Sequence, residues 1–431
     1  MSTQPQKTLL NEIATLLSGK AVAQIVALLA YLALTRLYSP DDFGLFNLFY
    51  SPIELLIIIS TCKLELSIIA AHTDPQAHDL ARLALRINTA VSLVLLAAVG
   101  GMVVCNALPG QFSALGLVAL IIPPFVFFCG TSRVYAALFN RQRQYRPMAW
   151  SETINSVTAA VAKIGLALVP LSRSGMPLGA LAGQMASNLN LIHRLRRTTN
   201  FFGTRSSRAQ LKAAARSARN YPLFVATKDI VSTLSANLPF LAAALPLATT
   251  ATTLTTTQLG LLGLALTLTA RPLNLFAGAC ERVLFARTAQ LQRSGQPIGK
   301  LVWRYLTVSY AIASVLCIVA YFVAEPACVL CFGDRWSGSG AYIRILLPWV
   351  VLRVGSLPLT FVANLFSTQR TELLFYIAQL ALSTAAIAIG LWQGSLLLGM
   401  RLFAMCGCII AVAITLWYMM QVHRYDHQIH S

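Results

Sequence analysis

Acidic residues are scarce in this sequence: only 14 of the 431 residues are Asp or Glu, and charged residues of both signs make up 11% of the chain. Soluble domains carry about 25% charged residues, so an ordinary soluble fold is excluded. The chain is 57% hydrophobic, and its apolar runs exceed the ~20 residues that cross a bilayer. We therefore expect an all-α polytopic membrane protein.

Motifs for several other chemistries are missing. The nine cysteines fall in or at the ends of apolar runs, where a thiol packs as a small hydrophobe. Cys328 and Cys331 form one CxxC pair, but no second pair or nearby His completes a zinc site. The Gly-rich stretch 332–340 has no phosphate-loop Lys. We expect no catalytic residue, metal or cofactor, although coupling of transport to the membrane potential, H+ or Na+ stays open.

Hydropathy and turn signals predict twelve membrane spans. Their expected ranges are 13–35, 43–71, 85–107, 115–139, 148–170, 176–193, 220–245, 258–286, 303–325, 341–366, 371–392 and 395–421. If the N-terminus is cytoplasmic, the links on the cytoplasmic side hold most of the cations, and the other links hold only Arg36, Arg173 and Arg335. Positive charge marks the cytoplasmic side, so we expect both termini inside and the first span to be uncleaved. The net charge of +19 then reflects topology and not a nucleic-acid partner.

The longest link divides the chain into two parts with six spans each. We expect an N-terminal lobe at 1–193, a basic cytoplasmic linker at 194–219 and a C-terminal lobe at 220–431. The linker's charge is typical of a topology signal, and recognition of anionic lipid is an alternative. A weak internal repeat supports two related halves, because Gly44 precedes Glu65 by the same spacing as Gly260 precedes Glu281. Glycines at 175, 179 and 183 predict close helix packing.

Ionisable residues inside the apolar runs are candidates for function because charge at membrane depth is costly. Basic residues outnumber acidic ones in the predicted spans, which favours a central cationic cavity and an anionic cargo. As substrate-binding residues we expect Arg271, Arg353, Lys163, Lys20 and Lys228. As coupling or gating residues we expect Glu54, Glu65, Asp229, Glu281 and Arg282. Lys163, Arg271, Arg353 and Glu54 fall near the middle of their predicted spans, and Lys63 and the others fall in the cytoplasmic third.

Structural ion pairs and snorkelling side chains are the competing explanation for these charges. For Arg282, Arg344, Glu152 and Arg401, near predicted span ends, this structural explanation is favoured. Asp229 has Lys228 as a neighbour with which it could pair. Glu54 has two alternative roles, a proton-coupling site or a partner for Arg271.

Three stretches carry a family resemblance. They are SGKAVAQIVALLAYLALTRLYSPDDFGLF at 18–46, KLELSIIAA at 63–71 and FGDRWSGSGAYIRILLPWVVLR at 332–353. Their order and spacing resemble the Wzx-type O-antigen and polysaccharide flippases of the multidrug/oligosaccharidyl-lipid/polysaccharide exporter superfamily.

The resemblance implies two six-helix lobes that alternate access to a cavity in the bacterial inner membrane. The implied cargo is an undecaprenyl-diphosphate oligosaccharide for O-antigen or exopolysaccharide biosynthesis. A polysaccharide polymerase and a chain-length regulator are the implied protein partners, alongside membrane lipids. The diphosphate would lie near Arg271 and Arg353, with Lys20 and Lys228 at the entrance, and the lipid tail would stay in the membrane between the lobes.

Three other functions compete with this one. A lipid II-type flippase also carries a polyprenyl diphosphate, but that group usually has more spans. A cation-drug antiporter of the same superfamily should have an acid deep in the first span, where this chain has only Glu12, at the boundary. A membrane-embedded glycan polymerase or ligase should expose a large outer loop with catalytic groups, and the outer loops predicted here are short.

Overall fold

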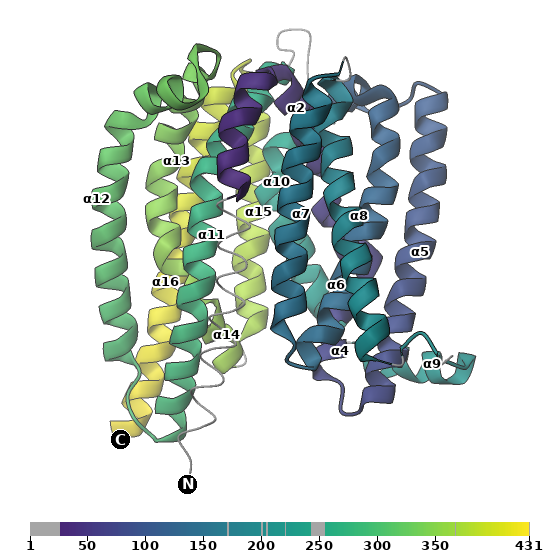
Figure 1. The fold of residues 1–431 in the computed structure, drawn as a ribbon. Coiled ribbons are helices and arrows are strands. Elements are labelled where there is room, and N and C mark those ends of the chain that lie inside the picture. Colours follow the sequence, from purple (N-terminus) through teal and green to yellow (C-terminus); the bar gives the residue numbers. More distant parts are fainter. Residues whose placement is uncertain are drawn as a thin grey trace. The chain divides into compact units, whose positions relative to one another are not determined.

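The computed structural model describes residues 26–169, 172–199, 201–203, 206–219, 221–242, 255–366 and 368–430. These residues form helices and connecting turns, and none of them is in a β-strand (Figure 1). The chain divides into two compact units, the first ending at Thr233 and the second beginning at Leu234. The all-α expectation is confirmed.

Eight helical segments among the described residues are long and apolar enough to cross a membrane. They are Pro40–Thr61, Asp74–Val104, Gly110–Arg141, Thr256–Gln292, Gly299–Phe332, Asp334–Ala363, Gln369–Trp392 and Leu396–Ile429. The described parts of the other predicted spans coincide with helices that fall short of this criterion, among them the short apolar helix Val26–Leu37. The count of twelve spans therefore stays a prediction.

The first unit contains a bundle with a buried core at one end. Its elements are α2 (Pro40–Tyr50), α3 (Ile53–Thr61), α4 (Leu64–Ala70), α5 (Asp74–Val104), η1 (Gly110–Ile121), α6 (Ile122–Arg141), α7 (Tyr145–Ala167), α8 (Ser172–Thr198), α9 (Arg208–Ser217), η2 (Tyr221–Ala226) and the start of α10 (Thr227–Leu241). Leu64 and Ile68 of α4 pack with Ala84 of α5, Phe139 of α6 and Leu195 of α8. This core holds α4 in place.

The predicted span at 43–71 is broken in two places, which the sequence analysis did not foresee. Ser39 caps α2, accepting a hydrogen bond from the backbone N–H of Asp42, and Pro52 separates α2 from α3. Cys62 and Lys63 both adopt left-handed backbone conformations, with φ of 49° and 56°. Such a conformation costs a non-glycine residue about 1–3 kcal/mol. The break places Lys63 at the junction between α3 and α4.

The glycines at 175, 179 and 183 bring α8 against α7, as expected. A Cβ on Gly179 would lie 2.7 Å from the backbone N of Lys163, and one on Gly183 would lie 2.6 Å from the backbone O of Asn155. Both are shorter than any ordinary contact, so a larger residue would push the helices apart. The packing interpretation of this repeat is confirmed.

The basic linker predicted at 194–219 is largely helical. α8 continues to Thr198, and α9 packs its Leu211 and Ala214 against the first unit, next to α5. Arg208, Lys212 and Arg216 are exposed on α9. Arg82 of α5 donates to the backbone O of Phe201 at 2.8 Å and to Oγ of Ser206 at 2.7 Å. The linker is thus docked on the first unit.

The second unit is organised around α13. After α10 it contains α11 (Thr256–Arg293), α12 (Gly299–Phe332), η4 (Asp334–Trp336), α13 (Ser337–Ser356), η5 (Leu357–Thr360), α14 (Phe361–Leu365), α15 (Gln369–Trp392) and α16 (Leu396–His430). α13 packs against α11, α12 and α16, and α15 packs against α16. A Cβ on Gly390 of α15 would lie 2.3 Å from Cα of Gly399 in α16, so these helices touch backbone to backbone.

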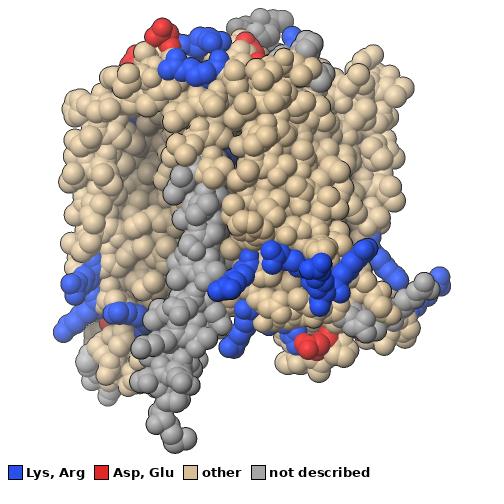
Figure 2. All heavy atoms as spheres, in the orientation of Figure 1, with Lys and Arg blue, Asp and Glu red and all other residues tan. Residues whose placement is uncertain are grey.

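The outer surfaces of the helices are apolar. On α12, Leu316, Phe322 and Leu330 are exposed by 63%, 71% and 80%. On the face that Figure 2 shows, the described residues along the sides of the helices are almost all uncharged, and Lys and Arg gather near the helix ends. This distribution is typical of helices that face lipid. Which end is cytoplasmic stays a prediction.

Candidate functional site

The shortest ion pair described in the first unit joins the break in the second span to the start of α10. Nζ of Lys63 lies 2.7 Å from Oδ2 of Asp229, and the two side chains are exposed by 16% and 34%. The sequence had offered Lys228 as the partner of Asp229. The structure gives Asp229 a partner from another element, Lys63 at the left-handed turn between α3 and α4, and pairing with Lys228 stays a prediction.

Two further acids of the first unit differ in their surroundings. Glu54 of α3 lies 3.9 Å from Arg133 of α6, and its side chain is 55% exposed, so this pair is weak. Glu65 of α4 is 9% exposed, and its Oε2 has no hydrogen-bond partner among the described residues. A buried carboxylate oxygen without a donor costs free energy. Glu65 is therefore the better coupling candidate of the two.

Lys163 does not lie at mid-helix as the sequence predicted. It is four residues before the end of α7 at Ala167, and its Nζ lies 4.4 Å from the centre of the Phe46 ring. Its backbone O accepts a hydrogen bond from Tyr38 at 2.8 Å. Burial, with a smaller effect of Asp42, raises the pKa of Tyr38 to about 12, so this hydroxyl stays a neutral donor. Lys163 thus contacts Phe46 of α2.

Among the predicted substrate-binding cations of the second unit, Arg353 is the one whose surroundings the structure defines best. It lies on α13 with its guanidinium 4.7 Å from the centre of the Trp349 ring. No described carboxylate lies within salt-bridge distance of it. Arg353 also lines a cavity of about 40 Å³ with Tyr376 and Gln379 of α15. This volume holds about one water molecule, so this cavity is too small for a larger anion.

The remaining predicted residues are spread over several elements. Arg271 is half-buried on α11, and Glu281 on the same helix accepts a hydrogen bond from Oγ1 of Thr360 at 3.0 Å. Lys228 is half-buried beside Asp229 on α10. Lys20 and the side chain of Arg282 lie outside the part of the chain that the structure describes. Whether these groups converge on one cavity stays a prediction.

One buried acid escaped the sequence analysis. Glu372, near the start of α15, is fully buried, and its Oε1 accepts a hydrogen bond from the Tyr418 hydroxyl at 2.8 Å. The signal was present, since Glu372 falls inside the span predicted at 371–392. Burial of a carboxyl group with a hydroxyl donor marks it as another candidate for coupling.

The residues expected to be structural lie as their positions suggest. Arg344 pairs with Glu325 at 3.1 Å and donates to the backbone O of Tyr321 at 3.0 Å. Glu152 and Arg401 are exposed. No group of three or more metal-ligating side chains occurs among the described residues. The candidate site residues are charged side chains, and their binding of ions or anions stays a prediction.

The comparisons with known proteins place the chain in a family. Residues 33–340 match the model of a family described as polysaccharide biosynthesis protein. The chain belongs to this family. A search of curated proteins found no match.

Solved structures show which fold this member of the polysaccharide biosynthesis protein family has. An inward-facing multidrug resistance MATE family transporter of the MOP superfamily matches with a TM-score of 0.73 and 15% identity, over 94% of this chain and 96% of that one. The lipid II flippase MurJ in an inward closed conformation matches with a TM-score of 0.72 and 11% identity, over 95% of this chain and 89% of that one. A MOP superfamily transporter from Pyrococcus furiosus is described as having a binding pocket of reverse polarity. It matches with a TM-score of 0.64 and 16% identity, over 98% of this chain and 97% of that one. At these identities the matches show the fold, and the expected fold is confirmed.

Proposed function

We propose that the protein is a flippase that moves undecaprenyl-diphosphate-linked oligosaccharide repeat units from the cytoplasmic to the outer leaflet of the bacterial inner membrane. It would act by alternating access in the synthesis of O-antigen or exopolysaccharide. The observation that carries the proposal is a family of polysaccharide biosynthesis combined with a transporter fold. A transporter in such a pathway needs a cargo that links sugar to lipid.

The charge of the second unit supports an anionic cargo. Arg353 has an aromatic ring beneath its guanidinium and no described carboxylate beside it, which leaves its N–H groups available to phosphate oxygens. Guanidinium groups bind phosphate through paired hydrogen bonds. We assign the diphosphate to Arg353 and Arg271, and the entrance to Lys228 and Lys20.

The proposed drive needs no ATP. With the cytoplasm negative, moving one net negative charge outward across the full field gains about 2.3 kcal/mol per 100 mV. Coupling to H+ or Na+ through Glu65, Asp229, Glu281 or Glu54 is an added source. Glu65 fits a coupling role because its buried Oε2 lacks a described donor. A polymerase and a chain-length regulator are the proposed protein partners.

A lipid II-type flippase is the second candidate, favoured by the structural match to MurJ. It shares the polyprenyl diphosphate and differs in the sugar, so the two are separated by which glycan accumulates when the protein is removed. A cation-drug antiporter and a glycan polymerase stay as weaker alternatives. The antiporter is weaker because its binding site should be acidic, whereas the predicted spans hold more basic than acidic residues.

The test measures the sidedness of lipid-linked oligosaccharide in spheroplasts that lack the protein, with a glycan label that cannot cross the membrane. We expect full repeat units to accumulate on the cytoplasmic leaflet and the wild-type gene to return them to the outer leaflet. Single repeat units accumulating on the outer leaflet would contradict the proposal, because translocation would then occur without this protein and a polymerase would be missing instead.

A further inference from the structure

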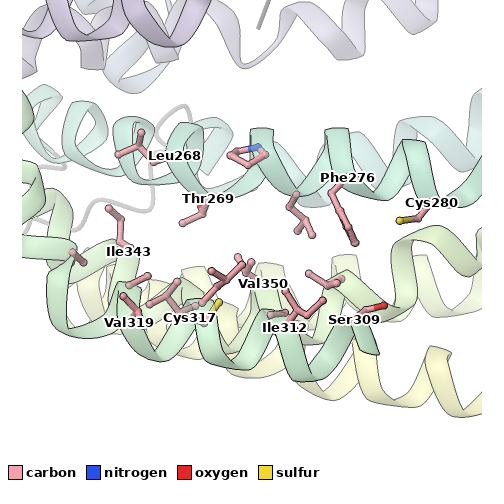
Figure 3. Close-up of a pocket in the computed structure, with 18 of the residues that line it drawn as sticks. Leu268, Thr269, Phe276, Cys280, Ser309, Ile312, Cys317, Val319, Ile343 and Val350 are labelled. Atoms are coloured by element: carbon pink, nitrogen blue, oxygen red, sulfur yellow. The ribbon is translucent and has the colours of Figure 1, made fainter. Parts of the chain in front are cut away.

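A long groove runs along the second unit between α11 and α12. Its volume is about 1240 Å³. Phe276 and Leu268 of α11 face Ile312 and Cys317 of α12 across it, and Val350 and Ile343 of α13 lie at its floor (Figure 3). α11 and α12 both pack on α13, and this arrangement leaves the space between them open.

The groove is apolar along its length and basic at one end. The hydroxyls of Thr269 and Tyr305 are already used, because they donate to the backbone O of Ala265 at 2.8 Å and of Val354 at 2.6 Å. Arg287 of α11 and Arg304 of α12 line the end where α11 finishes and α12 begins. Both side chains are exposed, and no described carboxylate pairs with either. Charge complementarity thus selects an occupant with an apolar tail and an anionic head.

The length of the groove selects among such lipids. Its lining on α11 runs from Leu268 to Arg287, which corresponds to about 28 Å of helix at 1.5 Å per residue. The hydrocarbon core of a bilayer is about 30 Å thick, so a phospholipid chain reaches only about half of that length. A tail that fills the groove must be longer than one leaflet, as a polyprenyl chain is.

We propose that this α11–α12 groove binds the polyprenyl tail of the cargo, with Arg287 and Arg304 beside the diphosphate when the lipid first docks. This assignment rests on the proposed function and changes one expectation, that the tail stays in the membrane between the lobes. The tail would instead be held by one unit, which keeps the cargo attached while the headgroup moves.

The test is photo-crosslinking of the full-length protein in phosphatidylcholine nanodiscs that contain trace undecaprenyl diphosphate with a photoreactive group in its tail. Labelled peptides are mapped by mass spectrometry. We expect label on Ile343 and Leu347, which are only 7% and 6% exposed and which bulk lipid should label poorly. Unlabelled undecaprenyl diphosphate should remove the label, whereas the same excess of phosphatidylglycerol should not.

Two matched variants on α12 isolate the groove. Ile312 lines it and is 55% exposed, whereas Ile318 is 60% exposed and does not line it. Ile312→Trp should lower labelling of α13 by about tenfold, because a ring in the groove displaces several methylene groups of the tail. Ile318→Trp should leave it unchanged. Arg287→Gln combined with Arg304→Gln should slow the onset of labelling.

Equal labelling in Ile312→Trp and Ile318→Trp would overturn the proposal. Displacement by phosphatidylglycerol as efficient as by undecaprenyl diphosphate would assign the groove to a resident phospholipid and would also overturn it. Both results leave the flippase function intact if spheroplasts still move repeat units outward. Failure of the spheroplast assay together with loss of all specific labelling would reject the function and the groove alike.

Discussion

Charged side chains of the two units are held in two ways, by a carboxylate or by an aromatic ring. In the first unit Lys63 lies 2.7 Å from Asp229 and Arg133 lies 3.9 Å from Glu54, although Lys163 lies over the Phe46 ring. In the second unit Arg353 lies over the Trp349 ring, and Glu372 accepts a hydrogen bond from the Tyr418 hydroxyl. An ion pair neutralises both partners, whereas an aromatic ring leaves the cation its charge. From this comparison we expect Arg353 to bind an anion better than Lys63 or Arg133.

Backbone shape follows the same division. The first unit breaks its second span at Cys62 and Lys63, and the break places Lys63 against Asp229. The corresponding helix of the second unit in the sequence repeat, α11, is a single helix of 38 residues that continues through Pro272. A broken helix with an ion pair across it can switch partners, and an unbroken helix moves as one body. We expect gating in the first unit and cargo binding in the second.

Arg353→Gln should have the largest effect on export. Replacing the guanidinium with a neutral amide removes a charge-assisted contact to phosphate, and we expect export to fall about 100-fold. Arg353→Lys should retain part of the activity. Export is measured as outer-leaflet repeat units per molecule of membrane-inserted protein. Arg401→Gln, on an exposed position of α16, is the control and should be mild; an equal loss in both variants would break the assignment.

Gly407→Val should also lower export, although it leaves Arg353 itself unchanged. A Cβ on Gly407 would lie 2.4 Å from Nε1 of Trp349, so a larger residue must displace the ring that supports Arg353. We expect export to fall about tenfold, since displacing a cation–π partner costs about 1–2 kcal/mol. Met405→Val, exposed on the same helix, should leave export unchanged. Normal export by correctly inserted Gly407→Val would show that the ring does not matter.

Tyr418→Phe should lower stability more than Tyr425→Phe. The first leaves buried Glu372 without its hydroxyl donor, at a cost of about 1–3 kcal/mol. The Tyr425 hydroxyl makes a longer hydrogen bond of 3.4 Å to the backbone O of Gln292. Thermal unfolding in detergent gives the ranking. A larger loss of stability in Tyr425→Phe would mean that the Tyr418 hydroxyl does not stabilise the buried Glu372.

Exchanging the charges of the Lys63–Asp229 ion pair should have the smallest effect on stability and export. Lys63→Asp and Asp229→Lys should each destabilise the protein, and the double variant should recover about 1 kcal/mol of coupling. The measurement is a double-mutant cycle of thermal unfolding, with export followed in parallel. Additive effects would show that the contact contributes nothing, and the contrast between the units would weaken.

Much of the fold could be predicted from the sequence because membrane helices follow hydropathy. Helices occupy the described parts of the predicted spans, and the glycines of α8 pack as their spacing indicated. The break at Cys62 and Lys63 could not be predicted, since neither residue favours a left-handed conformation and tertiary contacts impose it. Lys63 and Asp229 are far apart in sequence, so their pairing was equally invisible. Lys163 was predicted near the middle of its span, whereas α7 ends four residues later, at Ala167.

The most direct test of the central claim is binding of undecaprenyl diphosphate to purified Arg353→Gln and Arg133→Gln proteins in nanodiscs. Each variant removes one guanidinium, the first over an aromatic ring in the second unit and the second beside Glu54 in the first. The account predicts that Arg353→Gln loses binding and that Arg133→Gln stays within about threefold of wild type, since a weak exposed pair contributes little. Loss of binding in Arg133→Gln with retention in Arg353→Gln would contradict it.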